Sequence, residues 1–377
     1  MTKLNKILIA ALAAQLLLIA VVLAGRETAT IPQPAPIVKD FDPEAVARID
    51  IHSPRDDDEG AEAPAVVLAR TDEAFVVQSA YGYPADRARV DELLSAVDQM
   101  AAREPIATSP GRARQLEVAD DRYDRRLVFQ DESGEARTLY LGAPAGQGRV
   151  AARVAGQDAI FAVQTSVGRS ARIREADWMQ QPFFEAKSDD IASLAIESEA
   201  IRATFTRDED GAWKLDDEAS DVAAPAGEVL DDGAVDAIAR EAARIRLAGV
   251  AGREPAPEHG LDEPRARIEI ELAPAADDDE GDGISVATER FTIVIGADDD
   301  DDRVHVRVDD RPFVALVSRS ALRDLLDADA EGLFASEEEL EEAEEAEGSP
   351  GDMPFEPPDT EGLPIPGAGG AAMPPTP

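Results

Sequence analysis

The chain has 377 residues, with 37 Lys and Arg against 79 Asp and Glu, and its formal net charge is −42. So acidic a chain repels phosphate backbones, and we therefore expect no nucleic-acid partner. The absence of cysteine removes disulfides, thiol nucleophiles and thiolate metal ligands. Hydrophobic residues make up 44% of the sequence, which is enough to form cores, and the length favours about two domains.

The first apolar run, residues 7–25, predicts a transmembrane helix. It carries no charged side chain, and Gln15 is its only clearly polar one. A helix needs about 20 apolar residues to cross a bilayer core, and this run just suffices. Lysines precede it, which places residues 1–6 in the cytoplasm and the bulk of the chain in the periplasm of a single-pass inner-membrane protein. A signal peptide cleaved after Ala24 is the alternative.

The stretch that follows, residues 26–40, contains Pro32, Pro34 and Pro36. Proline fixes φ and lacks a backbone N–H, so regular structure is disfavoured here. The stretch predicts a semi-extended spacer that holds the next domain off the membrane.

A first α+β unit is predicted over residues 41–187. Residues 46–51 alternate apolar and polar side chains, as a half-buried strand does. Short apolar runs on either side of polar turns then predict hairpins. The expected hairpins cover residues 65–78, 125–141 and 149–163.

The first unit also has a predicted helix, which Pro84 opens. Its expected buried face consists of Val90, Leu93, Leu94, Val97 and Met100. Gly142 is expected to end a strand, and the unit closes with Trp178 and the pair Phe183-Phe184.

A second unit, residues 188–335, follows the same plan. Its predicted strands and helices cover residues 191–196, 202–207, 212–215, 232–245, 267–272, 290–295, 303–308, 313–317 and 320–326. Gly296 is expected to end a strand as Gly142 does, and Leu333-Phe334 closes the unit. We interpret the chain as a tandem duplication of an antiparallel-sheet-plus-helix unit, and two unrelated α+β halves are the alternative. Residues 336–377, acidic and then rich in Pro and Gly, predict a disordered tail.

Short motifs in the second unit carry a family resemblance. They are Gly211-Ala212-Trp213-Lys214-Leu215 in the first hairpin and His259-Gly260-Leu261-Asp262-Glu263-Pro264 before the next strand. With the anchor and the order of elements over residues 41–334, they resemble bacterial proteins of the domain of unknown function 4340 family. The second motif is similar to the family's Tyr-Gly-Leu-Asp-x-Pro segment, with His259 in the aromatic position. In the first unit, Phe75 stands in place of the Trp and residues 115–118 in place of the Gly-Leu segment.

The resemblance implies a membrane-tethered extracytoplasmic protein. It also implies an association with ABC-type export systems of the gliding-motility auxiliary kind. It assigns no catalytic residue to this chain.

One acidic stretch comes near the calcium-binding loop of an EF-hand. The residues at its positions one, three, five, six and twelve are Asp278, Glu280, Asp282, Gly283 and Glu289. Ser285 occupies the usual apolar position, and the flanks are predicted strands rather than helices. A solvated acidic hairpin loop is therefore the favoured interpretation, and residues 298–302 are expected to form a similar loop with weak affinity for divalent cations.

We expect no catalytic residue and no cofactor. His52, His259 and His305 have no partner at a zinc-motif spacing, and each is expected at a strand end or turn. The sequence has no Gly-x-Ser-x-Gly elbow and no Gly-x-x-x-x-Gly-Lys loop, although a triad of residues distant in the chain stays open.

These observations favour a non-enzymatic, membrane-anchored scaffold or accessory protein. Its expected partners are the membrane and an envelope protein or transporter subunits. The alternative is an extracytoplasmic binding module for a small ligand or divalent cation. The sequence indicates no particular oligomeric state.

Overall fold

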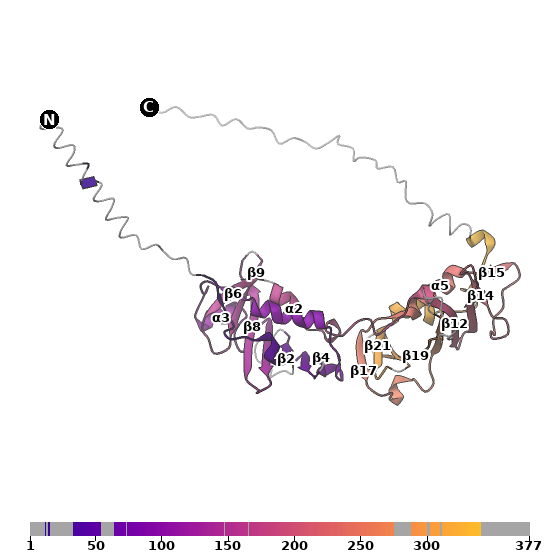
Figure 1. Cartoon of the computed structure of the whole chain (residues 1–377), viewed down its shortest axis with the longest axis horizontal. Helices are drawn as coiled ribbons and strands as arrows, with labels where there is room; N and C mark the ends of the chain where they lie inside the picture. Colours follow the sequence, from indigo (N-terminus) through magenta and orange to yellow (C-terminus); the bar gives the residue numbers. More distant parts are fainter. Residues whose placement is uncertain are drawn as a thin grey trace, which may run out of the picture.

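The structure is a computed structural model that describes residues 12, 14–15, 33–53, 64–72, 74–146, 148–164, 166–274, 288–299, 302–309 and 311–340. It has two lobes, each built on an eight-stranded antiparallel sheet with a few helices (Figure 1). This confirms the α+β class. The predicted membrane helix, except for Leu12, Ala14 and Gln15, and the tail beyond residue 340 lie outside the described residues. Within the described ranges, no helix is both long enough and apolar enough to cross a membrane.

The first sheet has the strand order β10-β9-β8-β7-β2-β3-β4-β5. In chain order the strands are β2 (Val46–His52), β3 (Val66–Arg70), β4 (Phe75–Val77), β5 (Tyr83–Pro84), β7 (Arg125–Asp131), β8 (Ala136–Pro144), β9 (Arg149–Val154) and β10 (Ile160–Gln164). The predicted hairpins are therefore confirmed. Alternation along β2 buries Ile49 and Ile51 completely, as expected of a strand with one face on a core.

The two faces of the first sheet are covered differently. Helix α2 (Arg87–Asp98) begins at Asp86, whose carboxylate accepts a hydrogen bond from the Arg89 N–H, and it buries most of the predicted apolar face. Short helix α3 (Pro110–Gln115) belongs to a second, smaller hydrophobic cluster that shares no buried residue with the main one. Its buried members are Ala113, Val118, Ala119, Tyr123, Tyr140, Ala151 and Ile160.

The second sheet has the strand order β14-β13-β12-β18-β19-β20-β21-β17. In chain order the strands are β12 (Ile191–Ser198), β13 (Arg202–Arg207), β14 (Trp213–Leu215), β17 (Gly249–Gly252), β18 (Ala266–Leu272), β19 (Arg290–Asp299), β20 (Arg303–Val308) and β21 (Val314–Ser318). Helix α5 (Asp232–Ala243) buries Val235, Ile238 and Ala242. The helix was predicted to end at Ile245. Residues 244–245 instead form a short strand, because they pair with residues 184–185.

Short ladders hold the ends of each unit. Strand β1 (Ala35–Pro36) pairs with β6 (Ala101–Ala102), and β11 (Phe184–Glu185) pairs with β16 (Arg244–Ile245). In both cases the segment before a unit pairs with the segment after its long helix. Strand β15 (Glu228–Leu230) pairs with β22 (Phe334–Ser336). Short helices α4 (Ser166–Ser170) and α6 (Arg323–Leu326) follow the last long strand of each unit.

Gly142 and Gly296 do not end strands, which corrects the sequence expectation. Strand β8 continues to Pro144 and β19 to Asp299, with a register shift just after Leu141 in β8 and just after Ile295 in β19. A Cβ atom at Gly142 would overlap the carbonyl oxygen of Leu116, and one at Gly296 would overlap that of His259. Glycine is needed at these bulges because another loop's backbone crosses the strand there.

Candidate functional site

The predicted calcium loop falls mostly outside the described residues, which include Glu289 but not Asp278, Glu280 or Asp282. Glu289 is exposed just before β19, and its carbonyl oxygen accepts a hydrogen bond of 2.9 Å from the Leu272 N–H. The elements on either side of the predicted loop, β18 and β19, are strands, as expected. Nowhere in the described part of the chain do three or more His, Asp or Glu side chains form a group suited to a metal ion.

Of the acidic residues predicted to form a loop at 298–302, Asp298 and Asp299 belong to β19, and residues 300 and 301 lie outside the described part of the chain. Arg265 donates two hydrogen bonds to the Asp298 carboxylate, at 2.8 and 2.7 Å, and Arg319 donates a third at 3.0 Å. The Arg265 hydrogen bonds hold the pKa of Asp298 below its usual range. Asp299 pairs with Arg303 in the same way. Both carboxylates therefore pair with arginines, and the partners of Asp298 lie 33 and 21 positions away in the chain.

The three histidines are buried, and two of them are in contact. His52 lies at the end of β2, as expected, against the Arg126 guanidinium at 2.9 Å. His259 and His305 stack, with ring centroids 4.6 Å apart and the rings inclined by 24°. The Ala256 N–H donates to His259 Nδ1, and His305 Nδ1 lies 2.9 Å from the Ala297 carbonyl oxygen. His305 lies inside β20, so its expected place at a strand end or turn was wrong.

This histidine stack should make folding stability depend on pH. Burial, and then His305, lowers the pKa of His259 below its ordinary value of 6.5. The unfolded chain therefore binds this proton more readily, so the stability is fully present above pH 6.5 and is lost as the pH falls through the lowered pKa. We expect His259→Tyr to lose less stability than the parent between about pH 7 and about pH 5 in thermal unfolding. Equal losses in the two proteins would contradict this role.

A pocket of about 550 Å³ lies beside α3 in the first unit. Arg153 lines the pocket, and its Nε donates to the Val118 carbonyl oxygen and its Nη2 to the Asp120 carboxylate, each at 2.5 Å. The guanidinium also lies over the Tyr140 ring, 4.7 Å from its centroid. The hydrogen bond from Arg153 lowers the pKa of Asp120, and burial raises that of Tyr140 to about 12. Arg153 therefore has partners within its own unit and joins β9 to the loop after α3.

The segment that connects the two units, called the connector here, contains Met179, Gln180 and Phe183. Its backbone forms hydrogen bonds with both units. Met179 forms a bridge with Ala85, and the Gln180 N–H donates to the Pro84 carbonyl oxygen at 2.9 Å. Shortly afterwards the Phe183 N–H donates to the Ile245 carbonyl oxygen at 2.8 Å, where the β11–β16 ladder begins. The connector is thus tied to the start of the long helix in one unit and to the end of the long helix in the other.

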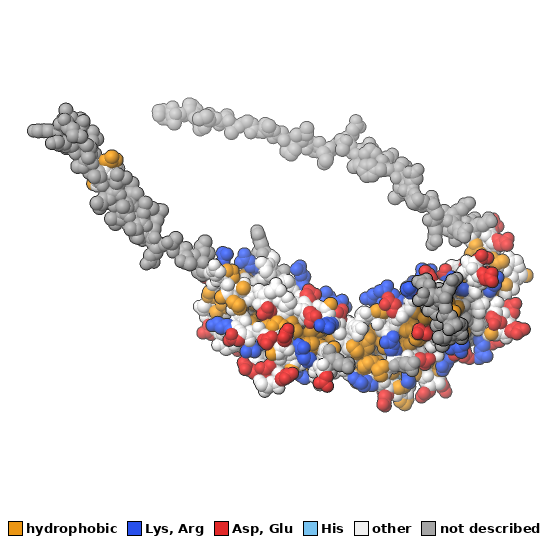
Figure 2. All heavy atoms as spheres, in the orientation of Figure 1, with side chains coloured by type: hydrophobic (Ala, Val, Ile, Leu, Met, Phe, Trp, Pro, Cys, Tyr) orange, Lys and Arg blue, Asp and Glu red, His pale blue; other side chains and the backbone are white. Residues whose placement is uncertain are grey.

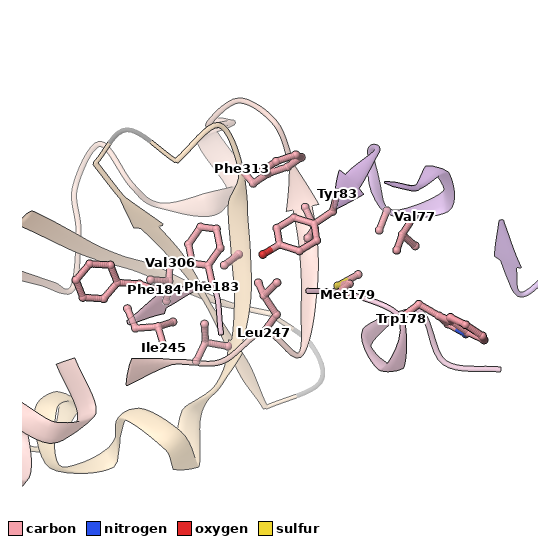
Figure 3. Close-up of a cluster of buried hydrophobic side chains, with 14 of the residues drawn as sticks. Val77, Tyr83, Trp178, Met179, Phe183, Phe184, Ile245, Leu247, Val306 and Phe313 are labelled. Atoms are coloured by element: carbon pink, nitrogen blue, oxygen red, sulfur yellow. The ribbon is translucent and has the colours of Figure 1, made fainter. Parts of the chain in front are cut away.

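Aromatic side chains fill the junction between the units. Figure 3 shows Tyr83 directed from β5 toward Phe313, Phe183 and Leu247. Its ring centroid lies 5.0 Å from that of Phe313 and 6.4 Å from that of Phe183. Its hydroxyl donates to the Gln180 carbonyl oxygen at 3.2 Å, and burial raises its pKa to about 12. Tyr83 is thus a neutral anchor that reaches from the first unit into the second.

Hydrogen bonds across the junction accompany this aromatic packing. The Gln181 side chain accepts a hydrogen bond from the Leu247 N–H and donates one to the Leu247 carbonyl oxygen, both at 3.0 Å. Arg253 lies over the Phe313 ring at 5.0 Å and donates to the Tyr81 carbonyl oxygen at 2.8 Å. One continuous hydrophobic cluster contains buried side chains from both sheets. The two units therefore form one body.

The sequence indicates Trp178 and Phe183-Phe184 as closing residues, but no pattern in it indicates Tyr83, Gln181, Arg253 or Phe313. A signal for the junction existed in the aromatic pair that closes the first predicted unit. The partners of that pair could not be found, because they lie far away in the chain and follow no local pattern.

Comparison with family models identifies a match over the middle of the chain. A family model described as "Domain of unknown function (DUF4340)" matches residues 76–264, which is half of the 377-residue chain. The matched segment begins in β4, contains the whole connector and ends just before β18, so it spans the junction. No curated protein matches the chain. No solved structure matches it either.

Proposed function

Because the chain belongs to the DUF4340 family, whose function is unknown, we propose that it is a single-pass, membrane-anchored extracytoplasmic scaffold. Its role is that of an accessory protein in an envelope complex or an ABC-type transport complex. Residues 7–25 are its anchor, with the N-terminus in the cytoplasm and the folded units outside. The long apolar run and the lysines that precede it support this orientation.

The observation that carries the proposal is the junction. Two independent sheets on a flexible linker would bind partners separately, whereas two sheets joined at Tyr83, Gln181 and Arg253 hold their outer surfaces in one fixed arrangement. A partner that contacts both lobes then meets a preorganised surface, and less conformational freedom is lost on binding. The family match includes Tyr83, Gln181 and Arg253, which come from both sides of this junction.

We further infer that the two units are tandem repeats, residues 41–187 and 188–335. The order β10-β9-β8-β7-β2-β3-β4 in one sheet corresponds to β21-β20-β19-β18-β12-β13-β14 in the other. Both long helices have an Asp N-cap, Asp86 and Asp231, whose N–H donates to the closing segment of its unit, at Trp178 and Leu333. Duplication explains how one chain acquired two similar lobes joined end to end.

Affinity purification of the full-length protein from membranes solubilised in mild detergent tests the proposal. We expect a multi-span membrane protein to be recovered in stoichiometric amount. The matched control is Tyr83→Ala, which loosens the junction and should reduce recovery of that partner while leaving membrane association unchanged. Recovery of the parent protein alone under these conditions would overturn the scaffold role.

A further inference from the structure

A groove of about 600 Å³ runs along β10, the outermost strand of the first sheet. We name it the anchor-side groove, because it is lined by Pro34, which lies between the proposed anchor and the first unit. Its most apolar feature is Ile106, whose side chain is 47% exposed. In the described part of the chain few large hydrophobic side chains are this exposed, and Ile106 lines a groove.

The groove is basic in a strongly acidic chain. Arg103 and Arg149 line it, both are exposed, and neither makes an ion pair within the part of the chain that the structure describes. Glu104 is the one carboxylate among the lining residues. Figure 2 shows basic and hydrophobic side chains side by side at this end of the first unit. The local charge is therefore opposite in sign to the net charge of −42.

The groove is also held close to the membrane by covalent geometry. Nine peptide steps separate Gly25, the last residue of the proposed anchor, from Pro34. At most about 3.5 Å per residue, they span about 30 Å, which is less than the width of many domains. Pro34 itself is fixed on the first unit because the adjacent strand β1 pairs with β6. Pro34 and the groove beside it therefore lie within about 30 Å of the end of the proposed anchor.

We propose that the anchor-side groove docks on the anionic headgroup layer of the membrane. Arg103 and Arg149 contact lipid phosphates, and Ile106 enters the headgroup boundary. Arginine suits this position because its guanidinium binds phosphate with two parallel hydrogen bonds. Tethering supplies a high effective concentration of headgroups, so a tethered protein needs a smaller basic surface than a free protein does. The inference rests on the proposed anchor and adds that the first unit is oriented by the lipid surface.

The absence of native cysteine makes a direct test possible. The full-length protein with Ile106→Cys carries a polarity-sensitive fluorophore and is reconstituted into vesicles of phosphatidylethanolamine and phosphatidylglycerol, or into vesicles of phosphatidylcholine alone. We expect the emission to shift to shorter wavelength in the anionic vesicles only, and to return at high salt, which screens charge. Val229→Cys is the matched control, because Val229 is 39% exposed and lies on β15, at the far end of the second lobe (Figure 1).

A second variant isolates the charge. Arg103→Glu together with Arg149→Glu should abolish the shift in fluorophore emission. Reversal of the charge at Arg240 and Arg246, both exposed on the second unit, should leave that shift intact. Resistance of the reconstituted protein to carbonate extraction is measured on the same samples. Identical emission in the two kinds of vesicle, from protein that resists extraction, overturns the docking inference and leaves the anchor standing. Extraction by carbonate overturns the anchor itself, and the docking inference with it.

Discussion

Gly296→Ala should destabilise the protein by about 3 kcal/mol or more, among the largest effects of any single substitution in the second unit. A Cβ atom at Gly296 would occupy the position of the His259 carbonyl oxygen. The loop cannot move away easily, because Gly260 packs against Ala297 in a left-handed conformation, with φ of 64°, and His259 is stacked on His305. The motif that resembles the family's Gly-Leu-Asp segment therefore locks a loop across a bulged strand.

Thermal and urea unfolding of Gly296→Ala measures this loss. Gly142→Ala should behave similarly, because a Cβ atom there would overlap the Leu116 and Glu117 carbonyl oxygens. The matched control is Gly168→Ala in α4, where no atom lies within 4 Å of the added carbon and helix propensity favours alanine. Loss of less than about 1 kcal/mol in Gly296→Ala would show that the crossing loop is free to shift.

Tyr83→Ala should destabilise the protein by about 3 kcal/mol and split its unfolding into two steps. The substitution removes the ring that packs on Phe313 and Phe183 across the junction, and it leaves a cavity between the units. Each unit keeps its own eight-stranded sheet, so the two are expected to unfold separately once their shared packing is lost.

Calorimetry distinguishes the two outcomes, because the parent protein should give a single transition and Tyr83→Ala two. Tyr83→Phe is the control, since it keeps the ring and removes only the hydrogen bond to Gln180, at a cost of about 1 kcal/mol. A single transition in Tyr83→Ala, at a temperature close to that of Tyr83→Phe, would show that the junction does not couple the units.

The long strands could be predicted because their evidence is local. Alternation at residues 46–51 and 191–196 places one set of side chains on a core, and β2 and β12 follow that pattern. Strand β17 could not be predicted, because Gly249-Val250-Ala251-Gly252 has weak strand propensity and no alternation. It exists because β21 offers an edge to pair with. The helix end at Ala243 has the same cause, since Arg244 and Ile245 pair with β11.

The glycine interpretations failed for a related reason. Gly142 and Gly296 follow apolar runs, which in a sequence resembles a turn. In the fold, Gly142 lies against the backbone of Leu116, 26 positions earlier, and Gly296 lies against that of His259, 37 positions earlier. No local sequence pattern indicates either contact. The junction is harder still, because Arg253 and Tyr81 bond across 172 positions. Family resemblance located the segment that contains these contacts but not the contacts themselves.

The two units form one body, and a distance measurement between them tests this arrangement most directly. Spin labels at Asp91→Cys on α2 and Arg240→Cys on α5 occupy exposed helical positions, one in each unit, in a chain without other cysteines. Pulsed electron resonance on the full-length protein should give one narrow distance distribution, which broadens when Tyr83→Ala is added. A broad distribution in the parent protein would contradict this arrangement.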